Sequence, residues 1–152
     1  MTRNDPDSTC LFCGIVDGAV DAEVVFADEV VTAFLDHRPL FHGHVLVVPN
    51  RHAVTLADLP EDDVGPFFAR VRHLSARMPD AMGCTGTFVA NNNIVSQSVA
   101  HLHLHVVPRT KGDGLRGFFW PRTTYAAGEA ASLAARLRPV FEESWREGRN
   151  SG

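Results

Sequence analysis

The sequence predicts an α+β fold in which about five antiparallel strands form one sheet and a long helix packs on it. Two observations support this prediction: five short stretches are rich in β-branched and aromatic residues, and only two stretches show helical periodicity. The length of 152 residues suits one domain, and the 45% hydrophobic content is enough for a packed core. We therefore expect one domain over residues 10–147, with disordered polar tails at 1–9 and 148–152.

Three strands are expected in the first third of the chain, at 24–26, 30–35 and 44–48. The polar segment Ala27-Asp28-Glu29 is short enough to join the first two as an antiparallel hairpin. The third follows the turn-prone segment Phe41-His42-Gly43 and stops before Pro49, whose missing N–H and fixed φ interrupt a central strand.

The second half alternates between helical and extended patterns. Apolar residues recur at helical spacing across 56–78, around an acidic start at 58–63, which predicts one amphipathic helix. Two more strands are expected, at 87–90 and at 100–107 before Pro108, separated by an asparagine-rich loop. A C-terminal helical segment follows at 129–146, and Pro139 is expected to kink or divide it.

Composition excludes several classes of function. The net charge of −4 provides no overall attraction to a nucleic-acid backbone, so long nucleic acid is not an expected partner. No apolar run is long enough to span a bilayer, so a membrane protein is not expected. The N-terminus is acidic where a signal peptide is basic, and we therefore expect a cytoplasmic protein.

Three histidines alternate along the last expected strand. Side chains two residues apart share a face of a strand, so His101, His103 and His105 should project together. The residues between them are apolar and should point into the core. A neutral imidazole near pH 7 can bind a metal or act as a nucleophile, and the spacing alone permits either use.

The segment from Gln97 to Val107 resembles the signature of the histidine-triad (HIT) superfamily of nucleotide hydrolases and transferases. Earlier blocks resemble the family in the same order: CLFCGIV at 10–16, AFLD at 33–36, GHVLVVP at 43–49, and RH at 51–52. The resemblance runs from about residue 10 to Arg109. It implies a HIT-like fold and a homodimer in which two sheets join across a two-fold axis.

The resemblance also implies the catalytic residues. His103 would attack the α-phosphorus and form a nucleotidyl-histidine intermediate that water then hydrolyses. His105 would hold and polarise the site, His101 would complete the triad, and Ser98 would bond phosphate oxygens or the leaving group.

Nucleotide binding is implied at several further positions. Asp36 would accept hydrogen bonds from both ribose hydroxyls. The base would lie between Phe12, Ile15, His37 and Leu46, although core packing alone would also explain the apolar members of this set. Asn91 or Asn92 would reach the sugar or phosphate, in a loop about one residue shorter than the family's, with Gln97 nearby.

A metal site is predicted from two cysteines. The spacing of Cys10 and Cys13 suits one metal ion held by a tight turn. Together with His52 and His101, they resemble the zinc site of many bacterial family members. Such a zinc would be structural, because four protein ligands leave no open position. The alternative is a reduced thiol pair without metal, and no organic cofactor is expected.

The leading functional prediction is a hydrolase acting on adenosine phosphoramidates or related purine nucleotide conjugates. Cleavage of dinucleoside polyphosphates is an alternative, if the basic segment with Lys111, Arg116 and Arg122 forms a channel for a second nucleotide. Trp120 would either line a leaving-group pocket or pack the C-terminal helix. A metal-dependent hydrolase with the three histidines as ligands is a weaker alternative.

A third alternative is a nucleotide-sensing binding module with little turnover. It arises because Ser96 replaces the family's usual glycine before Gln97. If that glycine has a positive φ, a serine there requires an altered phosphate loop.

Overall fold

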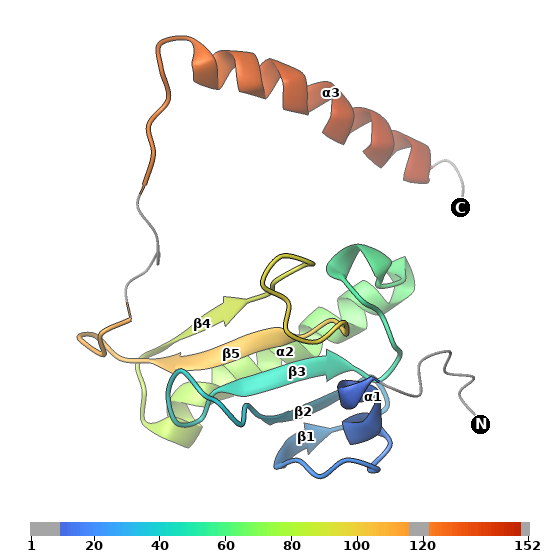
Figure 1. The fold of residues 1–152 in the computed structure, drawn as a ribbon, viewed down its shortest axis with the longest axis vertical. Helices are drawn as coiled ribbons and strands as arrows, with labels where there is room; N and C mark the ends of the chain where they lie inside the picture. Colours follow the sequence, from blue (N-terminus) through green and yellow to red (C-terminus); the bar gives the residue numbers. More distant parts are fainter. Residues whose placement is uncertain (1–9, 116–121, 150–152) are drawn as a thin grey trace. The chain divides into compact units, whose positions relative to one another are not determined.

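The computed structural model describes residues 10–115 and 122–149, with only the backbone of 143–149. Two compact units are distinguished, Met1–Asp113 and Gly114–Gly152. The first unit contains the sheet and the second contains the C-terminal helix (Figure 1). Trp120 and Arg116, to which the sequence assigned alternative roles, lie outside the described residues.

The sheet is five-stranded and antiparallel, with the strand order β1-β2-β3-β5-β4, which confirms the predicted fold class (Figure 1). The strands are β1 (Val24–Ala27), β2 (Val31–Leu35), β3 (Val45–Pro49), β4 (Gly86–Ala90) and β5 (Leu104–Arg109). The expected hairpin joins β1 and β2, where Asp28 Oδ1 accepts hydrogen bonds from the backbone N–H groups of Val30 and Val31.

The prediction of a strand over 100–107 is wrong at both ends. Residues 100–103 have no ladder partner, because β3 pairs with β5 only from Leu104 to Val106. A backbone hydrogen bond from Leu102 N–H to the carbonyl of Ala53 holds this segment beside the loop after β3. At its other end, β5 continues through Pro108, which pairs with β4 alone. A proline is tolerated there because its missing N–H faces no second strand.

The long helix α2 spans Glu61–Met82, so the predicted start at Leu56 is wrong. Residues Leu56–Asp58 form a separate 3-10 turn, and Leu59 is extended with ψ of 122°. Leu59 precedes Pro60, and a proline ring disfavours helical geometry in the residue before it. Helix α2 then continues past the predicted end and stops at Gly83, whose φ of 65° suits glycine.

The two faces of the sheet have different covers. Phe67, Val71 and Met78 of α2 pack on one face, against a core that includes Leu102, Leu104 and Val106. On the opposite face a smaller core joins sheet residues to the short helix α1 (Leu11–Val16); it consists of Phe12, Ile15, Phe34, Leu46 and Val48. The apolar residues between the three histidines therefore point into the α2 side, as predicted.

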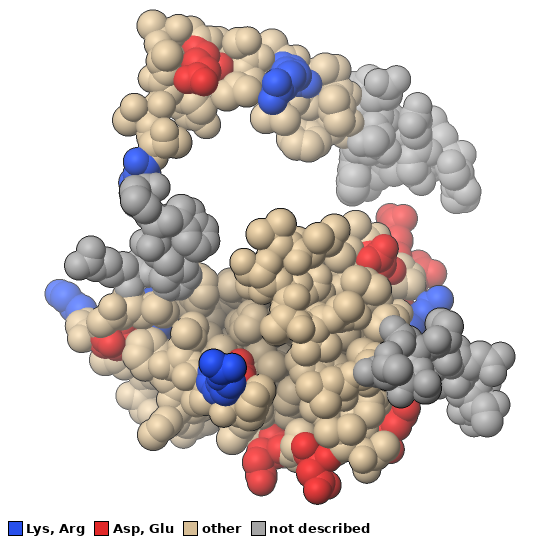
Figure 2. All heavy atoms as spheres, in the orientation of Figure 1, with Lys and Arg blue, Asp and Glu red and all other residues tan. Residues whose placement is uncertain are grey.

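Helix α3 (Glu129–Arg149) forms the second unit. It runs through Pro139 as one helix, so the predicted division there does not occur. None of the described helices is both long and apolar enough to cross a bilayer. On the face drawn in Figure 2, the described lysines and arginines are scattered and form no basic stripe of the kind that tracks a polyanion.

Candidate active site

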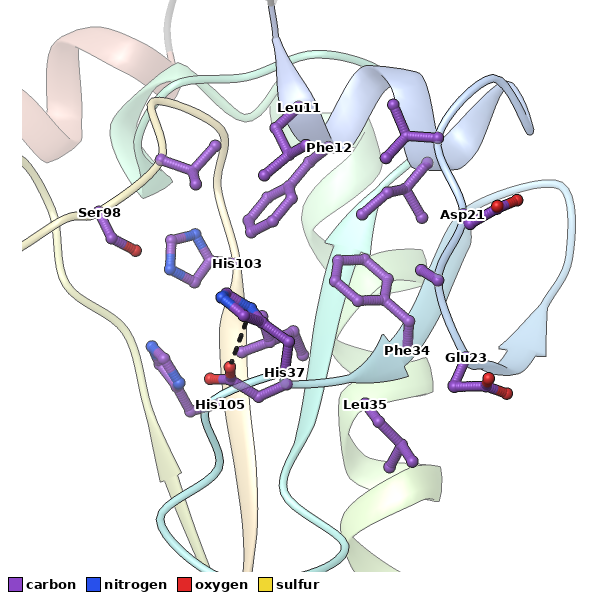
Figure 3. A pocket seen from close by; sticks show the side chains of 16 residues that line it. Leu11, Phe12, Asp21, Glu23, Phe34, Leu35, His37, Ser98, His103 and His105 are labelled. Atoms are coloured by element: carbon purple, nitrogen blue, oxygen red, sulfur yellow. Dashed lines mark ion pairs between the residues drawn. The ribbon is translucent and has the colours of Figure 1, made fainter.

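A pocket of ≈ 870 Å³ lies on the α1 side of the sheet. It is lined from α1, the segment before β1, the end of β2 and the approach to β5. Among its lining residues are many of the predicted site residues: Phe12, Ile15, Asp36, His37, Leu46, Ser98, His103 and His105. Figure 3 shows Ser98, His103 and His105 along one side of this pocket, with Phe12 and Phe34 beside them. Phe34 was not predicted as a site residue, because its strand pattern indicated only core packing.

The proton position on His103 follows from its hydrogen bond. His103 Nδ1 lies 2.7 Å from the backbone oxygen of His101. A carbonyl oxygen only accepts, so Nδ1 carries the proton and donates it. Nε2 then has the lone pair, on a side chain that is 2% exposed and lines the pocket. This is the protonation state that a nitrogen nucleophile requires.

A second histidine chain ends in the same pocket. The backbone N–H of Leu40 donates to His44 Nδ1 at 3.1 Å, so His44 carries its proton on Nε2. His44 Nε2 lies 2.9 Å from His105 Nδ1 and donates to it. His105 therefore carries its proton on Nε2. Each ring is held in one tautomer by its neighbour.

Burial keeps both rings of this chain neutral near pH 7. Desolvation, followed by the nearby His103 and His44 rings, lowers the pKa of His105 from 6.5 to about 4, while the Asp36 carboxylate opposes the shift. Desolvation also lowers the pKa of His44 against the opposing effect of Asp36. His105 is thus a neutral hydrogen-bond donor beside the lone pair of His103.

Sequence reasoning gave His44 no catalytic role. It lies in the block GHVLVVP, which resembles the family, but its ring could equally have been a packing residue. Ligand atoms of Asp36, His44 and His105 lie within 4.8 Å of one another, a spacing that could hold a metal ion. A metal on His44 Nε2 would displace the proton that the Leu40 hydrogen bond places there. The three side chains therefore fit a hydrogen-bond chain better than a metal site.

Asp36 is positioned by the turn after β2. Its Oδ1 accepts a hydrogen bond from the backbone N–H of Arg38 at 2.9 Å, and its Oδ2 lies 3.8 Å from His44 Nε2. The carboxylate is 16% exposed and lines the pocket. The neighbouring His37 side chain is 86% exposed at the pocket's edge.

Aromatic contacts build the apolar wall. The Phe12 ring meets Phe34 edge-on at a centroid distance of 5.3 Å and His103 at 5.2 Å. Ile15 and Leu46 complete the same buried cluster. Flat, apolar surfaces of this kind suit an aromatic base.

The asparagine-rich loop supports the site from outside the pocket. Asn91 Nδ2 donates to the carbonyl of His103 at 3.0 Å, and its buried Oδ1 has no hydrogen-bond partner among the described residues. Asn92 and Gln97 make hydrogen bonds within and beside the loop and do not line the pocket. Ser96 has a φ of 61°, so this serine adopts the left-handed conformation that glycine favours.

The two cysteines meet two histidines beside this pocket. His52 Nδ1 lies 3.2 Å from His101 Nδ1 and 3.2 Å from Cys13 Sγ. His101 Nδ1 lies 3.5 Å from the Sγ atoms of both Cys10 and Cys13. All four ligand atoms lie within 4.8 Å of one another. His101 is fully buried here and does not line the pocket, so the structure places it with the cysteines.

These distances fit a tetrahedral metal. Bonds of about 2.3 Å to sulfur and about 2.0 Å to nitrogen give tetrahedral edges of about 3.3 Å between nitrogens and about 3.5 Å between sulfur and nitrogen. His101 Nε2 donates to the carbonyl of Pro49 at 2.9 Å, which leaves the Nδ1 lone pair facing the thiols. Histidine ligands of metals are commonly oriented by such a carbonyl.

Comparison with known proteins gives a consistent picture. The HIT domain family matches residues 17–112. An uncharacterised HIT-like protein of Methanocaldococcus jannaschii is 39% identical over 107 residues, covering 69% of this chain and 82% of that protein. Adenylylsulfatase HINT3 of Arabidopsis thaliana is 32% identical over 108 residues, covering 70% of this chain and 55% of that protein.

A solved structure is similar over most of both chains. The crystal structure of a zinc-bound histidine triad family protein from Mycobacterium smegmatis has a TM-score of 0.65 and 34% sequence identity. The match covers 87% of this chain and 97% of that one.

Proposed function

The chain belongs to the histidine-triad (HIT) family, and from this premise we propose that it cleaves AMP conjugates at the α-phosphate through a nucleotidyl intermediate on His103. The observation that carries the proposal is the hydrogen bond from His103 Nδ1 to the carbonyl of His101. This bond leaves a lone pair on the pocket-facing nitrogen. It also gives the ring an acceptor for the positive charge that develops as that nitrogen attacks phosphorus.

The reaction divides into two displacements. His103 Nε2 attacks the α-phosphorus, the bond from phosphorus to the leaving group breaks, and an amine leaving group takes up a proton. Water then attacks the same phosphorus, the bond to His103 breaks, AMP is released, and a proton returns to solvent. Covalent catalysis of this kind replaces one difficult step by two easier ones.

The other pocket residues would position the substrate and stabilise charge. His105, neutral and carrying its proton on Nε2, donates a hydrogen bond to the phosphoryl group or leaving atom. Ser98 lies on the same side of the pocket and offers a hydroxyl (Figure 3). Asp36 accepts from the ribose hydroxyls, and the base lies against Phe12 and Phe34.

We favour phosphoramidates and similar AMP conjugates over dinucleoside polyphosphates as substrates. One relative is named for an adenylylsulfatase activity, which also removes a small group from AMP. The polyphosphate alternative requires basic side chains near the substrate, and none of the described residues that line the pocket is a lysine or an arginine. The sensing-module alternative depended on an altered loop, and the positive φ of Ser96 argues against it.

We propose that the Cys10, Cys13, His52 and His101 cluster holds a structural zinc ion. Two thiolates and two imidazoles are the donor set that zinc prefers, and the zinc-bound relative supports this choice. The metal would tie the start of α1 to the segment that precedes β5. With four protein ligands it has no open position, so it would not activate water.

We also propose a homodimer, as the family resemblance implies. In the described sheet, β4 has a neighbour on one side only, and its Val89 side chain is 41% exposed. Pairing with a second copy would cover such an edge. Sedimentation equilibrium at micromolar concentration measures the mass directly, and a strict monomer would contradict this proposal.

One experiment tests the enzymatic proposal. Wild type and His103→Ala are incubated with an adenosine phosphoramidate and, separately, with a diadenosine polyphosphate. AMP release and protein-bound adenylate are followed by mass spectrometry. We expect wild type to release AMP from the phosphoramidate with a transient adenylate, and His103→Ala to bind nucleotide without either product.

Controls make each outcome decisive. His73→Ala removes a histidine that contacts Phe26, away from the pocket lining, and should keep full turnover. Preference for the polyphosphate would overturn the substrate assignment. Binding without release by wild type would favour the sensing module, and turnover by His103→Ala would overturn the mechanism.

A further inference from the structure

We propose that Cys10 and Cys13 are a redox-modification site: a peroxide joins their sulfur atoms as a disulfide, and this change releases the metal and loosens the adjoining nucleotide pocket. The proposal goes beyond the hydrolase function and concerns its control. It rests on the placement of the two sulfurs and on two structural connections from them to the pocket.

The sulfur atoms are close enough to react with each other. Both lie 3.5 Å from the same atom, His101 Nδ1, and within 4.8 Å of each other. Cys10 caps α1 and Cys13 lies in its first turn, where the Cys13 N–H is 3.5 Å from Cys10 Sγ. The third cysteine, Cys84, packs against the core on the α2 side of the sheet, so it is a natural control.

Exposure gives the two cysteines different roles. Cys10 is half-buried, whereas Cys13 is 8% exposed. A peroxide in solvent therefore meets Cys10 first, and Cys13 resolves the product. An accessible thiolate beside a second thiol is the usual arrangement of a reversible cysteine sensor.

The first connection to the pocket is through α1. The two residues between the cysteines, Leu11 and Phe12, both line the pocket. The Phe12 ring lies 5.2 Å from the His103 ring and 6.1 Å from the His101 ring. A change in the bonds made by the cysteines on either side must therefore be transmitted to the wall against which the base would lie.

The second connection is through His101. Its ring faces the thiols through Nδ1, while its backbone carbonyl accepts the hydrogen bond from His103 Nδ1 at 2.7 Å. Without metal, the ring keeps its hydrogen bond to the carbonyl of Pro49 but loses the link that joins it to Cys10, Cys13 and His52. The residue that orients His103 then loses one of the groups that fix its ring.

The oxidation balances with a peroxide as the sole oxidant. The Cys10 thiolate attacks an oxygen of hydrogen peroxide, the O–O bond breaks, and hydroxide leaves a sulfenic acid on Cys10. The Cys13 thiolate attacks that sulfur, the S–O bond breaks, and a second hydroxide leaves. The sulfurs lose two electrons and the peroxide oxygens gain them. A disulfide has no thiolate to offer, so the metal loses half its ligands.

The test uses the full chain, reduced, in wild type, Cys84→Ser and Cys10→Ser, with wild type and Cys84→Ser loaded with zinc. Each protein is treated with a small excess of hydrogen peroxide and then with dithiothreitol plus zinc. Peptide mass spectrometry identifies the disulfide, a chromogenic chelator measures released zinc, and hydrogen exchange follows 10–17 and 97–106 with α2 as internal reference. AMP affinity is measured in parallel.

In wild type and Cys84→Ser we expect a Cys10–Cys13 disulfide, matching zinc release, and faster exchange in both pocket segments but not in α2. AMP affinity should fall roughly tenfold or more, as for loss of residues that orient a site, and dithiothreitol plus zinc should reverse every change. Cys10→Ser, which should hold little zinc before treatment, should form no Cys10–Cys13 disulfide, and peroxide should leave its exchange at 97–106 unchanged.

Three results would overturn the proposal: a disulfide through Cys84, irreversible oxidation without a disulfide, or a Cys10–Cys13 disulfide with unchanged exchange at 97–106. Failure of the reduced protein to bind AMP would instead contradict the proposed hydrolase function. The disulfide, zinc and exchange measurements decide the redox site in that case as well.

Discussion

His44 Nε2 lies 2.9 Å from His105 Nδ1, and this contact sets the proton positions of both rings. Because the N–H of Leu40 already donates to His44 Nδ1, the shared proton belongs to His44. His105 is left with its own proton on Nε2, beside the lone pair of His103. A hydrogen bond made just before β3 thus determines what a residue of β5 offers to a substrate.

Replacing His44 by leucine should slow catalysis with little effect on nucleotide binding. Without its donor, His105 is free to adopt the other tautomer and present a lone pair in place of a proton. We expect kcat to fall roughly 10-fold to 100-fold, somewhat less than for loss of a direct oxyanion donor, and KM to change little. Steady-state kinetics with an adenosine phosphoramidate measures both constants.

Two variants separate this effect from a loss of packing. His44→Gln places an amide N–H near the original Nε2 and should recover much of kcat, whereas His73→Leu makes the same change away from the pocket. Thermal melts establish that each variant is folded. Equal losses of kcat in His44→Gln and His44→Leu would show that the hydrogen bond from His44 to His105 does not account for the slower catalysis.

The lowered pKa of His105 predicts a pH dependence of stability. The folded protein keeps this ring neutral until about pH 4, whereas the unfolded chain binds the proton near 6.5. Between these values the unfolded state binds more protons, so the contribution of His105 to stability is present above pH 6.5 and is lost as pH falls toward 4. Chemical denaturation of wild type and His105→Gln at several pH values and fixed zinc measures it.

The difference between the two proteins isolates His105, because the rest of the sequence is the same in both. We expect the His105→Gln protein to lose less stability than wild type over this range. If the free energy of unfolding depended on pH in the same way in both proteins, His105 would have its ordinary pKa in the folded protein.

Removing one metal ligand should remove the metal and destabilise the fold together. Purified wild type should contain about one zinc per chain, and Cys10→Ser should contain little, because a ligand set of four is incomplete without it. Elemental analysis and thermal melting are the measurements. Cys84→Ser, which lies on the other face of the sheet, should keep both zinc and stability. Metal-free wild type with unchanged stability would refute the structural zinc.

Serine at position 96 carries a backbone cost that glycine would remove. Its φ of 61° lies in the left-handed region, which a side chain disfavours. Ser96→Gly should raise the free energy of unfolding by about 0.5–1 kcal/mol, measured by urea denaturation. Val95→Gly is the matched control: Val95 is 79% exposed and is not among the residues with positive φ, so the change should lower stability. A destabilised Ser96→Gly would contradict this account.

The fold class could be predicted because local patterns carry it. The β-branched and aromatic stretches within 24–35 and 44–48 and the helical spacing after Pro60 depend on neighbouring residues only. The residues at which helices and strands begin and end could not be predicted in this way. The start of α2 was set by Pro60 acting on Leu59, and the start of β5 was set by where β3 provides a partner. Pairing partners lie far away in sequence, so no local pattern reveals where a ladder stops.

The candidate site likewise combines features that the sequence predicts with features that only distant contacts decide. By itself, the sequence determined the candidate residues: His103 and His105 in the alternating run, Asp36 after its strand, and the paired cysteines. Tertiary structure alone decided how they are arranged. It placed His101 with the cysteines and not in the pocket, and it brought His44 against His105. The physical reason is that tautomers and ligand sets depend on atoms a few ångströms apart in space, which the chain supplies from residues up to 91 positions apart.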